Sequence, residues 1–126
     1  GNIRTGYATT ILLEGSKPKT PLFLTINFPL AMPIKNLKIF SGYGKSKALF
    51  AQNHRIKSMR ITSTYELSKK ELTFDKKFDL KDDFESQTVS LGIPLAKTIR
   101  VEILELYKGS KFNDLVISEL NLSAGR

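Results

Sequence analysis

Apolar and polar residues alternate in short runs along this chain, which is the spacing of a β-strand with one buried face. The clearest alternation lies in residues 22–28 and 99–103. In the second run Ile99, Val101 and Ile103 share one face, whereas an arginine and a glutamate occupy the other. Weaker runs predict further strands at residues 34–40, 55–63, 72–74, 78–80, 88–93 and 115–122, and residues 2–7 are polar and turn-like.

Prolines and turn residues divide these runs. Pro29 and Pro33 are expected to end the first strand and frame a turn, and Pro94 to end the strand at 88–93, because proline donates no ladder hydrogen bond. The lysines at 34–40 do not keep to one parity, so we expect a small irregularity there. No segment combines a sustained helical period with caps. Short strands separated by turn residues therefore predict an antiparallel β-sandwich or barrel with almost no helix.

The size of the chain indicates one domain. Its 126 residues, of which 40% are hydrophobic, suffice for a single core. We expect one module over residues 1–126. One interpretation is that the module is a piece of a longer exported protein, with Gly1 left over from cloning. No apolar run has membrane-spanning length, so no transmembrane segment is expected.

The charge and the rare residue types narrow the class of function. Twenty Lys and Arg against twelve Asp and Glu give a net charge of +8, spread along the whole chain. Such a charge favours acidic partners, namely anionic polysaccharide, a membrane surface or nucleic acid, although it also serves solubility alone. Of these we expect no nucleic-acid partner. The absence of cysteine excludes disulfides, and a single histidine excludes a multi-histidine metal site.

The residues do not suggest catalysis. The chain lacks a Gly-x-Ser-x-Gly elbow, a phosphate-binding Gly-x-x-x-x-Gly-Lys loop and a His-Glu-x-x-His helix. Asp82 and Asp83 are expected to be solvated turn formers rather than glycosidase carboxylates. His54, without an evident orienting carboxylate, is expected to be a hydrogen-bonding surface residue rather than a general base. We therefore expect no enzyme and no catalytic residue.

Two loops concentrate aromatic and cationic side chains. The first spans residues 42–55, where glycines at the entry permit backbone angles closed to other residues, and the second spans 107–114. Sugars present apolar faces that stack on aromatic rings, and hydroxyls that need fixed donors and acceptors. The predicted ligand-binding residues are Tyr43, Asn53, Arg55, Tyr107 and Lys108. The alternative for each aromatic residue is to pin its own loop, and Phe50 is the stronger candidate for that role.

The same two loops carry a resemblance to a known family. The motifs that carry it are Gly42-Tyr43, Leu49-Phe50-x-x-Asn53-x-Arg55-Ile56-Lys57, Tyr107-Lys108-Gly109-Ser110-Lys111-Phe112-x-Asp114 and Ile117-Ser118-Glu119-Leu120. They resemble the NADase-type glycan-binding domain, a discoidin or galactose-binding-like jelly roll. That domain is the non-catalytic module preceding the enzyme domain of a secreted NAD-glycohydrolase toxin. The resemblance covers about residues 2–122 and implies an all-β antiparallel β-sandwich of jelly-roll, galactose-binding-domain-like type.

The resemblance also implies a structural calcium site, which this chain matches only in part. In many related sandwiches an early aspartate and a late glutamate hold the ion together with backbone carbonyls. Glu119 matches the glutamate, but Thr5 stands where the aspartate is found. Losing a charged oxygen ligand weakens an all-oxygen site. We therefore expect no tight calcium site and no other cofactor, with Glu119 pairing with a cation or capping backbone amides.

The residues and the resemblance favour a non-catalytic glycan-binding module of a secreted or cell-surface bacterial protein. We expect a monomer whose partner is a glycan or glycoconjugate. Two alternatives stay open. In the first, the module serves protein–protein contact or structure, and its loops touch another domain. In the second, the basic loops bind anionic membrane or polysaccharide surfaces.

Overall fold

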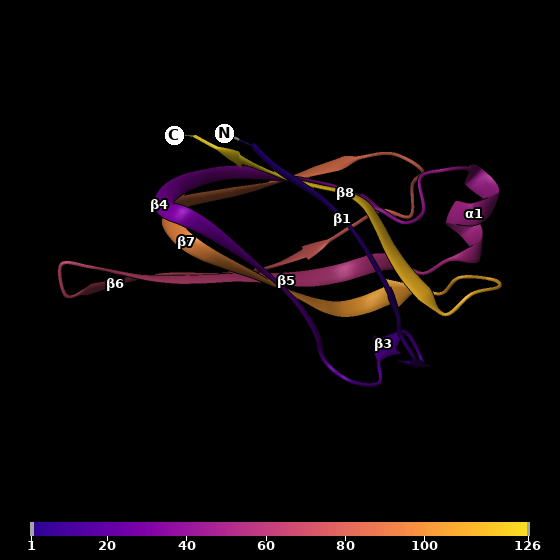
Figure 1. Ribbon diagram of the computed structural model, residues 1–126. Helices are drawn as coiled ribbons and strands as arrows, with labels where there is room; N and C mark the ends of the chain where they lie inside the picture. The colour runs from indigo at the N-terminus through magenta and orange to yellow at the C-terminus, as the bar shows by residue number, and fades with distance from the viewer. Residues whose placement is uncertain (1, 126) are drawn as a thin grey trace.

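β-Strands make up most of residues 2–125, the part of the chain that the computed structural model describes, with side chains described from Tyr7 onward (Figure 1). The strands are β1 (Asn2–Thr10), β2 (Leu13–Glu14), β3 (Lys17–Pro18), β4 (Leu22–Ser41), β5 (Arg55–Leu67), β6 (Lys70–Asp79), β7 (Gln87–Tyr107) and β8 (Asp114–Ala124). One short helix, α1 (Lys47–Gln52), lies between β4 and β5. The helix is too short to cross a membrane, and no other helix is described.

Two long strands, β4 and β7, build the sandwich by bending together. Residues 22–27 of β4 pair with 98–103 of β7, and residues 34–39 of β4 pair with 87–93 of β7. β8 and then β1 pair onto the second half of β4, whereas β5 and then β6 pair onto the second half of β7. The strand order β1-β8-β4-β7-β5-β6 therefore forms two antiparallel layers that share β4 and β7 (Figure 1). This arrangement confirms the predicted antiparallel β-sandwich.

The prolines mark bends rather than strand ends. Pro29 and Pro33 lie within β4 and Pro94 lies within β7, so the prediction that they end strands was wrong. The ladder between β4 and β7 shifts register at these positions, and a residue without a backbone N–H is tolerated where pairing is already interrupted. The expected irregularity in residues 34–40 is confirmed, since one register shift falls between Ile34 and Asn36.

Three further segments differ from the sequence prediction. Residues 2–7 belong to β1, which pairs with β8, rather than to a turn. The two short strands expected at 72–74 and 78–80 are one strand, β6, which pairs with β5 along its whole length. The helix α1 was missed because six residues are too few to show a helical period. Its first turn is capped by Ser46, whose hydroxyl accepts from the Leu49 backbone N–H at 3.1 Å.

The core lies between the two layers and takes side chains from both. Its fully buried large members are Ile34, Leu37, Ile39, Ile56, Met59, Ile61, Ile99, Ile103, Leu106, Leu115, Ile117 and Leu120. In the run at 99–103 the apolar residues are buried as predicted, and Arg100 lies on the exposed outer face. The hydrophobic pattern therefore predicts correctly which face of this strand is buried.

Val101→Asp is expected to abolish cooperative folding. The side chain is 1% exposed, and burying an unpaired carboxylate costs several kcal/mol, comparable with a total stability of about 5–15 kcal/mol. The neighbouring change Arg100→Ala is the control. It is expected to cost about 1 kcal/mol or less, because the contact that it removes is that of an exposed guanidinium 4.2 Å from the ring centre of Phe23. Thermal melting followed by circular dichroism checks both variants. A soluble Val101→Asp protein that melts cooperatively would contradict the assignment of faces.

Candidate functional site

The two predicted loops meet at one end of the sandwich, and main-chain hydrogen bonds join them. The N–H of Ser110 donates to the carbonyl of Ala51 at 3.0 Å, and that of Phe112 donates to the carbonyl of Gln52 at 2.9 Å. A Cβ at Gly109 would lie 2.4 Å from the same Gln52 oxygen, so only glycine permits this approach. Figure 1 shows α1 beside the loop that precedes β8. The loops therefore form one continuous surface.

The entry of the first loop is fixed by contacts with β8 and α1. The hydroxyl of Ser118 donates to the carbonyl of Gly42 and accepts from the N–H of Gly44, both at 2.7 Å. Gly42 has φ +122°, and a Cβ there would lie 2.6 Å from the ring of Phe50. The expectation that a glycine is required at this entry is therefore confirmed at Gly42.

A buried arginine organises the first loop. The Nε and Nη2 of Arg55 donate to the two carboxylate oxygens of Asp82 at 2.8 and 2.7 Å. Its Nη1 donates to the carbonyls of Phe50, Ala51 and Asn53 at 3.3, 3.2 and 2.9 Å. Carbonyls at the C-terminal end of a helix lack intrahelical donors, and the guanidinium supplies them. Arg55 thus fastens the end of α1 to the turn that carries Asp82.

The pairing of this arginine with Asp82 was missed from sequence. Asp82 is exposed in the connection between β6 and β7, in line with the prediction of a solvated turn residue, but its carboxylate also forms the two-point contact with Arg55. The pair was missed because Asp82 lies 27 residues from Arg55 in sequence, so local pattern carries no sign of it. The side chain of Asp82 is 37% exposed and that of Arg55 is 10% exposed, so the contact is sheltered mainly on the arginine side.

The five predicted ligand-binding residues all belong to the joined loops or their bases, but their environments differ. Asn53 is buried, and its side-chain amide donates to the Leu49 carbonyl at 2.8 Å, which completes the end of α1. Arg55 is likewise engaged internally. Tyr43 is half-buried and Lys108 is exposed. A direct ligand contact from any of these residues stays a prediction.

Tyr107 combines a fixed hydroxyl with a ring near two cations. Its hydroxyl donates to the carbonyl of Leu80 at 2.8 Å, and the ring centre lies 6.0 Å from the guanidinium carbon of Arg55 and 5.8 Å from Nζ of Lys57. Burial, reinforced by the carboxylate of Asp82, raises the pKa of Tyr107. The hydroxyl therefore remains a donor through the neutral range, which holds the ring in one orientation.

Phe50 has the pinning role predicted for it. The ring is 8% exposed and makes edge-to-face contacts with Phe40 and Phe84 at centroid distances of 6.2 and 5.5 Å. The guanidinium carbon of Arg55 lies 5.0 Å from its centre. Such aromatic pairs add about 0.5–1.5 kcal/mol each beyond burial. Phe50 therefore packs α1 onto the sandwich.

The prediction that His54 is a surface residue was wrong. Its side chain is 1% exposed, because its backbone N–H donates to the carbonyl of Asp114 at 2.8 Å and draws the residue against β8. Its Nδ1 accepts from the N–H of Gly109 at 2.8 Å. The imidazole therefore lies at the junction of the two loops. The sequence gives no sign of this position, because Gly109 is 55 residues away from His54.

Glu119 pairs with a cation, as one of its two predicted roles requires. Its Oε1 lies 4.0 Å from Nζ of Lys38 and accepts from the hydroxyl of Ser86 at 3.2 Å. Thr5 lies in β1 opposite Leu120, and its side chain is outside the described ones. Among the residues whose placement is described, no three His, Cys, Asp or Glu side chains gather into a metal-binding group. The absence of a tight calcium site stays a prediction.

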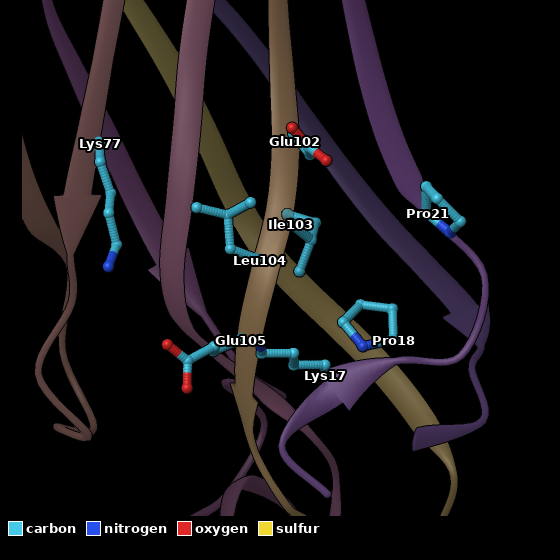
Figure 2. A pocket seen from close by; sticks show the side chains of 8 residues that line it. All are labelled: Lys17, Pro18, Pro21, Lys77, Glu102, Ile103, Leu104 and Glu105. Carbon is cyan, nitrogen blue, oxygen red and sulfur yellow. The ribbon is translucent and has the colours of Figure 1, made fainter. Parts of the chain in front are cut away.

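A shallow pocket lies apart from the joined loops. Its lining residues are Lys17, Pro18, Pro21, Lys77, Glu102, Ile103, Leu104 and Glu105 (Figure 2). The hydroxyl of Ser16 donates to Oε2 of Glu105 at 3.0 Å, which holds the β2–β3 hairpin against β7 and forms one wall. None of the five predicted ligand-binding residues lines this pocket.

Arg55→Met is expected to lower the free energy of unfolding by about 3 kcal/mol, because it leaves buried carbonyls without donors and Asp82 without its cation. The matched control is Arg60→Met. Arg60 makes the same two-point contact with Asp75, but both side chains are about half exposed, so water screens the pair and the loss should be small. Urea unfolding of both variants measures the difference. Equal losses would show that Arg55 has no special structural role.

Excess calcium is expected to leave the melting temperature unchanged, because the site implied by the resemblance lacks a carboxylate at Thr5. Thermal melting with calcium and with a chelator checks this expectation. A ligand at about a hundred times its dissociation constant would add roughly 2.7 kcal/mol of stability. A rise of several degrees with calcium that the chelator reverses would show that Glu119 and backbone oxygens suffice.

Comparison with known proteins identifies the family of this module. Residues 10–123 match the family model described as the NAD glycohydrolase translocation F5/8 type C domain. A solved chain described as truncated AlyQ with CBM32 and alginate lyase domains matches with a TM-score of 0.50 and 14% identity, over 97% of this chain and 27% of that chain. This likeness concerns the fold alone. No curated protein matches the sequence. The chain belongs to the NAD glycohydrolase translocation F5/8 type C domain family, with a discoidin-like, galactose-binding-like β-sandwich.

Proposed function

We propose that this module is a non-catalytic glycan-binding unit of a secreted or cell-surface protein, and that it binds through the joined loops. Membership of an F5/8 type C family supports a binding role, and the family's description in terms of NAD glycohydrolase translocation favours an exported setting. The observation that carries the proposal is the direct main-chain bonding between the two aromatic and cationic loops. Through it, rings and cations from distant parts of the sequence come to one place.

The joined loops are ordered before any ligand arrives. Arg55 makes five hydrogen bonds within the protein, and Gly42 and Gly109 allow contacts that a larger residue would block. A loop that becomes ordered only on binding loses conformational entropy, which weakens affinity, whereas a preformed surface avoids this loss. In this proposal Asn53 and Arg55 therefore shape the site, whereas Tyr43, Tyr107 and Lys108 touch the ligand.

Exposed rings and lysines supply the contacts that a sugar needs. Phe112 is 38% exposed, and Nζ of Lys111 lies 5.2 Å from its ring centre. Lys57 and Lys108 are both exposed. Nζ of Lys57 lies 5.8 Å from the ring centre of Tyr107, and Lys108 follows Tyr107 in the sequence. Aromatic faces stack on the C–H surface of a pyranose, and ammonium groups bind hydroxyl, carboxylate or sulfate oxygens. This combination favours a glycan that carries negative charge.

A glycan array on the isolated module tests the proposal, followed by titration of a bound glycan into single variants. Phe112→Ala is expected to weaken binding about tenfold, equivalent to about 1.4 kcal/mol, through the lost ring contact. Phe23→Ala is the matched control. Phe23 is 40% exposed and also lies under a cation, Arg100, but it belongs to the outer face of the sandwich. Equal affinities of the two variants would place the ligand elsewhere.

Lysine variants separate a glycan site from a general anionic surface. Lys108→Ala is expected to weaken glycan binding, whereas Lys97→Ala, an exposed lysine near the bend of β7, should not. If both changes weaken binding equally and 0.5 M salt abolishes it, the module binds anionic surfaces through its overall charge, because exposed charges are screened within about 8 Å already at physiological salt. If the array retains no glycan, a protein partner becomes the better proposal.

A further inference from the structure

We propose that His54 is an acid-sensitive latch between the two loops, which holds the binding surface together at neutral pH and releases it when the imidazole is protonated. The latch is a property of the folded module itself. Only its consequence, release of the ligand in acid, rests on the proposed function.

The position of His54 connects three segments. Its backbone N–H donates to the Asp114 carbonyl at the start of β8, and residue 54 forms an isolated bridge with Leu115. Its Nδ1 accepts the backbone N–H of Gly109 from the second loop at 2.8 Å. The residue itself follows the end of α1 in the first loop. One imidazole therefore ties the first loop to the second.

The hydrogen bond requires a neutral imidazole. Because Nδ1 accepts, it carries no proton, and the ring proton of the neutral form lies on Nε2. This Nε2 is buried and has no hydrogen-bond partner among the described residues. Protonation would turn Nδ1 into a donor that faces the N–H donor of Gly109, so the bond would be lost and two donors would oppose each other. The main-chain bonds of Ser110, Lys111 and Phe112 to the first loop would then have to hold the two loops together without the histidine.

The charges around His54 also oppose protonation. Lys108 from the second loop and Arg55 from β5 both disfavour a positive imidazole, and Asp114 from β8 is the group that favours it. Burial has the largest effect, and together these influences lower the pKa of His54 from its ordinary value. A positive charge here would be repelled by two existing cations and attracted by one carboxylate.

The direction of the pH dependence follows from this lowered pKa. The unfolded chain takes up a proton on His54 near pH 6.5, whereas the folded protein takes it up only at lower pH. Between these two values the unfolded state binds more protons, so acid favours opening or unfolding. The contribution of His54 to stability is therefore complete above about pH 6.5 and is lost as the pH falls toward the folded-state pKa.

Loss of the latch would act directly on the proposed binding surface. Gly109 adjoins Lys108 on one side and Ser110 on the other, and the N–H of Ser110 bonds to Ala51 in the first loop. If Gly109 moves away from His54, Lys108 and the rest of the second loop shift relative to the first loop, whereas Tyr107 stays paired with Arg55 at the base of the loop. Rings and cations that contact one ligand together would then contact it separately, and affinity would fall.

The substitution His54→Asn tests the latch. The asparagine Oδ1 stands close to the position of Nδ1 and accepts the same N–H, but it does not titrate. Melting temperatures of both proteins are measured from pH 7.5 to pH 5.0. All carboxylates are common to the two proteins, so a melting temperature that falls several degrees further in the unsubstituted protein supports the latch. Parallel pH profiles of the two proteins overturn it.

A second measurement on the unsubstituted protein keeps the test valid if His54→Asn folds poorly. The chain has one histidine, so every imidazole nitrogen signal in its NMR spectrum comes from His54. The latch predicts an Nε2-protonated neutral ring at pH 7.5 and a lower protection factor for the Gly109 amide, relative to its intrinsic exchange rate at each pH, as the ring titrates. A ring that titrates at the ordinary pKa with an unchanged Gly109 protection factor would overturn the proposal. Neither measurement uses a glycan, so failure of the glycan proposal leaves this test intact.

Discussion

The joined loops at one end of the sandwich depend for their order on the hydrogen bonds of the buried Arg55 guanidinium. A β-sandwich orders its strands by ladder bonding, but this gives no order to the segments that join them. Arg55 provides that order by donating to three carbonyls at the end of α1 and to both oxygens of Asp82. A planar donor with five N–H groups suits this task, whereas a lysine offers a single point charge. The first loop therefore behaves as part of the scaffold.

The pairing of β5 with β7 explains why this contact lies beside the second loop. β5 begins at Arg55 and β7 ends at Tyr107, and these two residues are direct partners in the ladder. The bases of both loops are thus one ladder spacing apart, which brings Gln52 and Phe112 within hydrogen-bonding distance. The rigid pairing of β5 with β7 consequently fixes where aromatic and cationic groups from the two loops stand relative to each other.

The fold could be predicted from the sequence, but only part of the site could, for physical reasons. Alternation at residues 99–103 depends on local burial, so it predicts the strand and its face correctly. Phe50 was assigned to packing because its neighbours are apolar, which is also local information. The roles of Asp82 and His54 depend on partners 27 and 55 residues away, and no local pattern records such pairs. The prolines were misassigned because a bend shared by two paired strands permits residues that an uninterrupted ladder excludes.

The proposed glycan-binding surface combines two loops that are distant in sequence. The most direct test is an NMR map of the backbone amides of the isotope-labelled module, recorded while a glycan selected on the array is added. We expect the shifts to concentrate together in residues 43–46 and 107–112 and to change with one common dissociation constant. Shifts confined to the pocket lined by Lys17, Lys77 and Glu102, or to only one of the two loops, would contradict it.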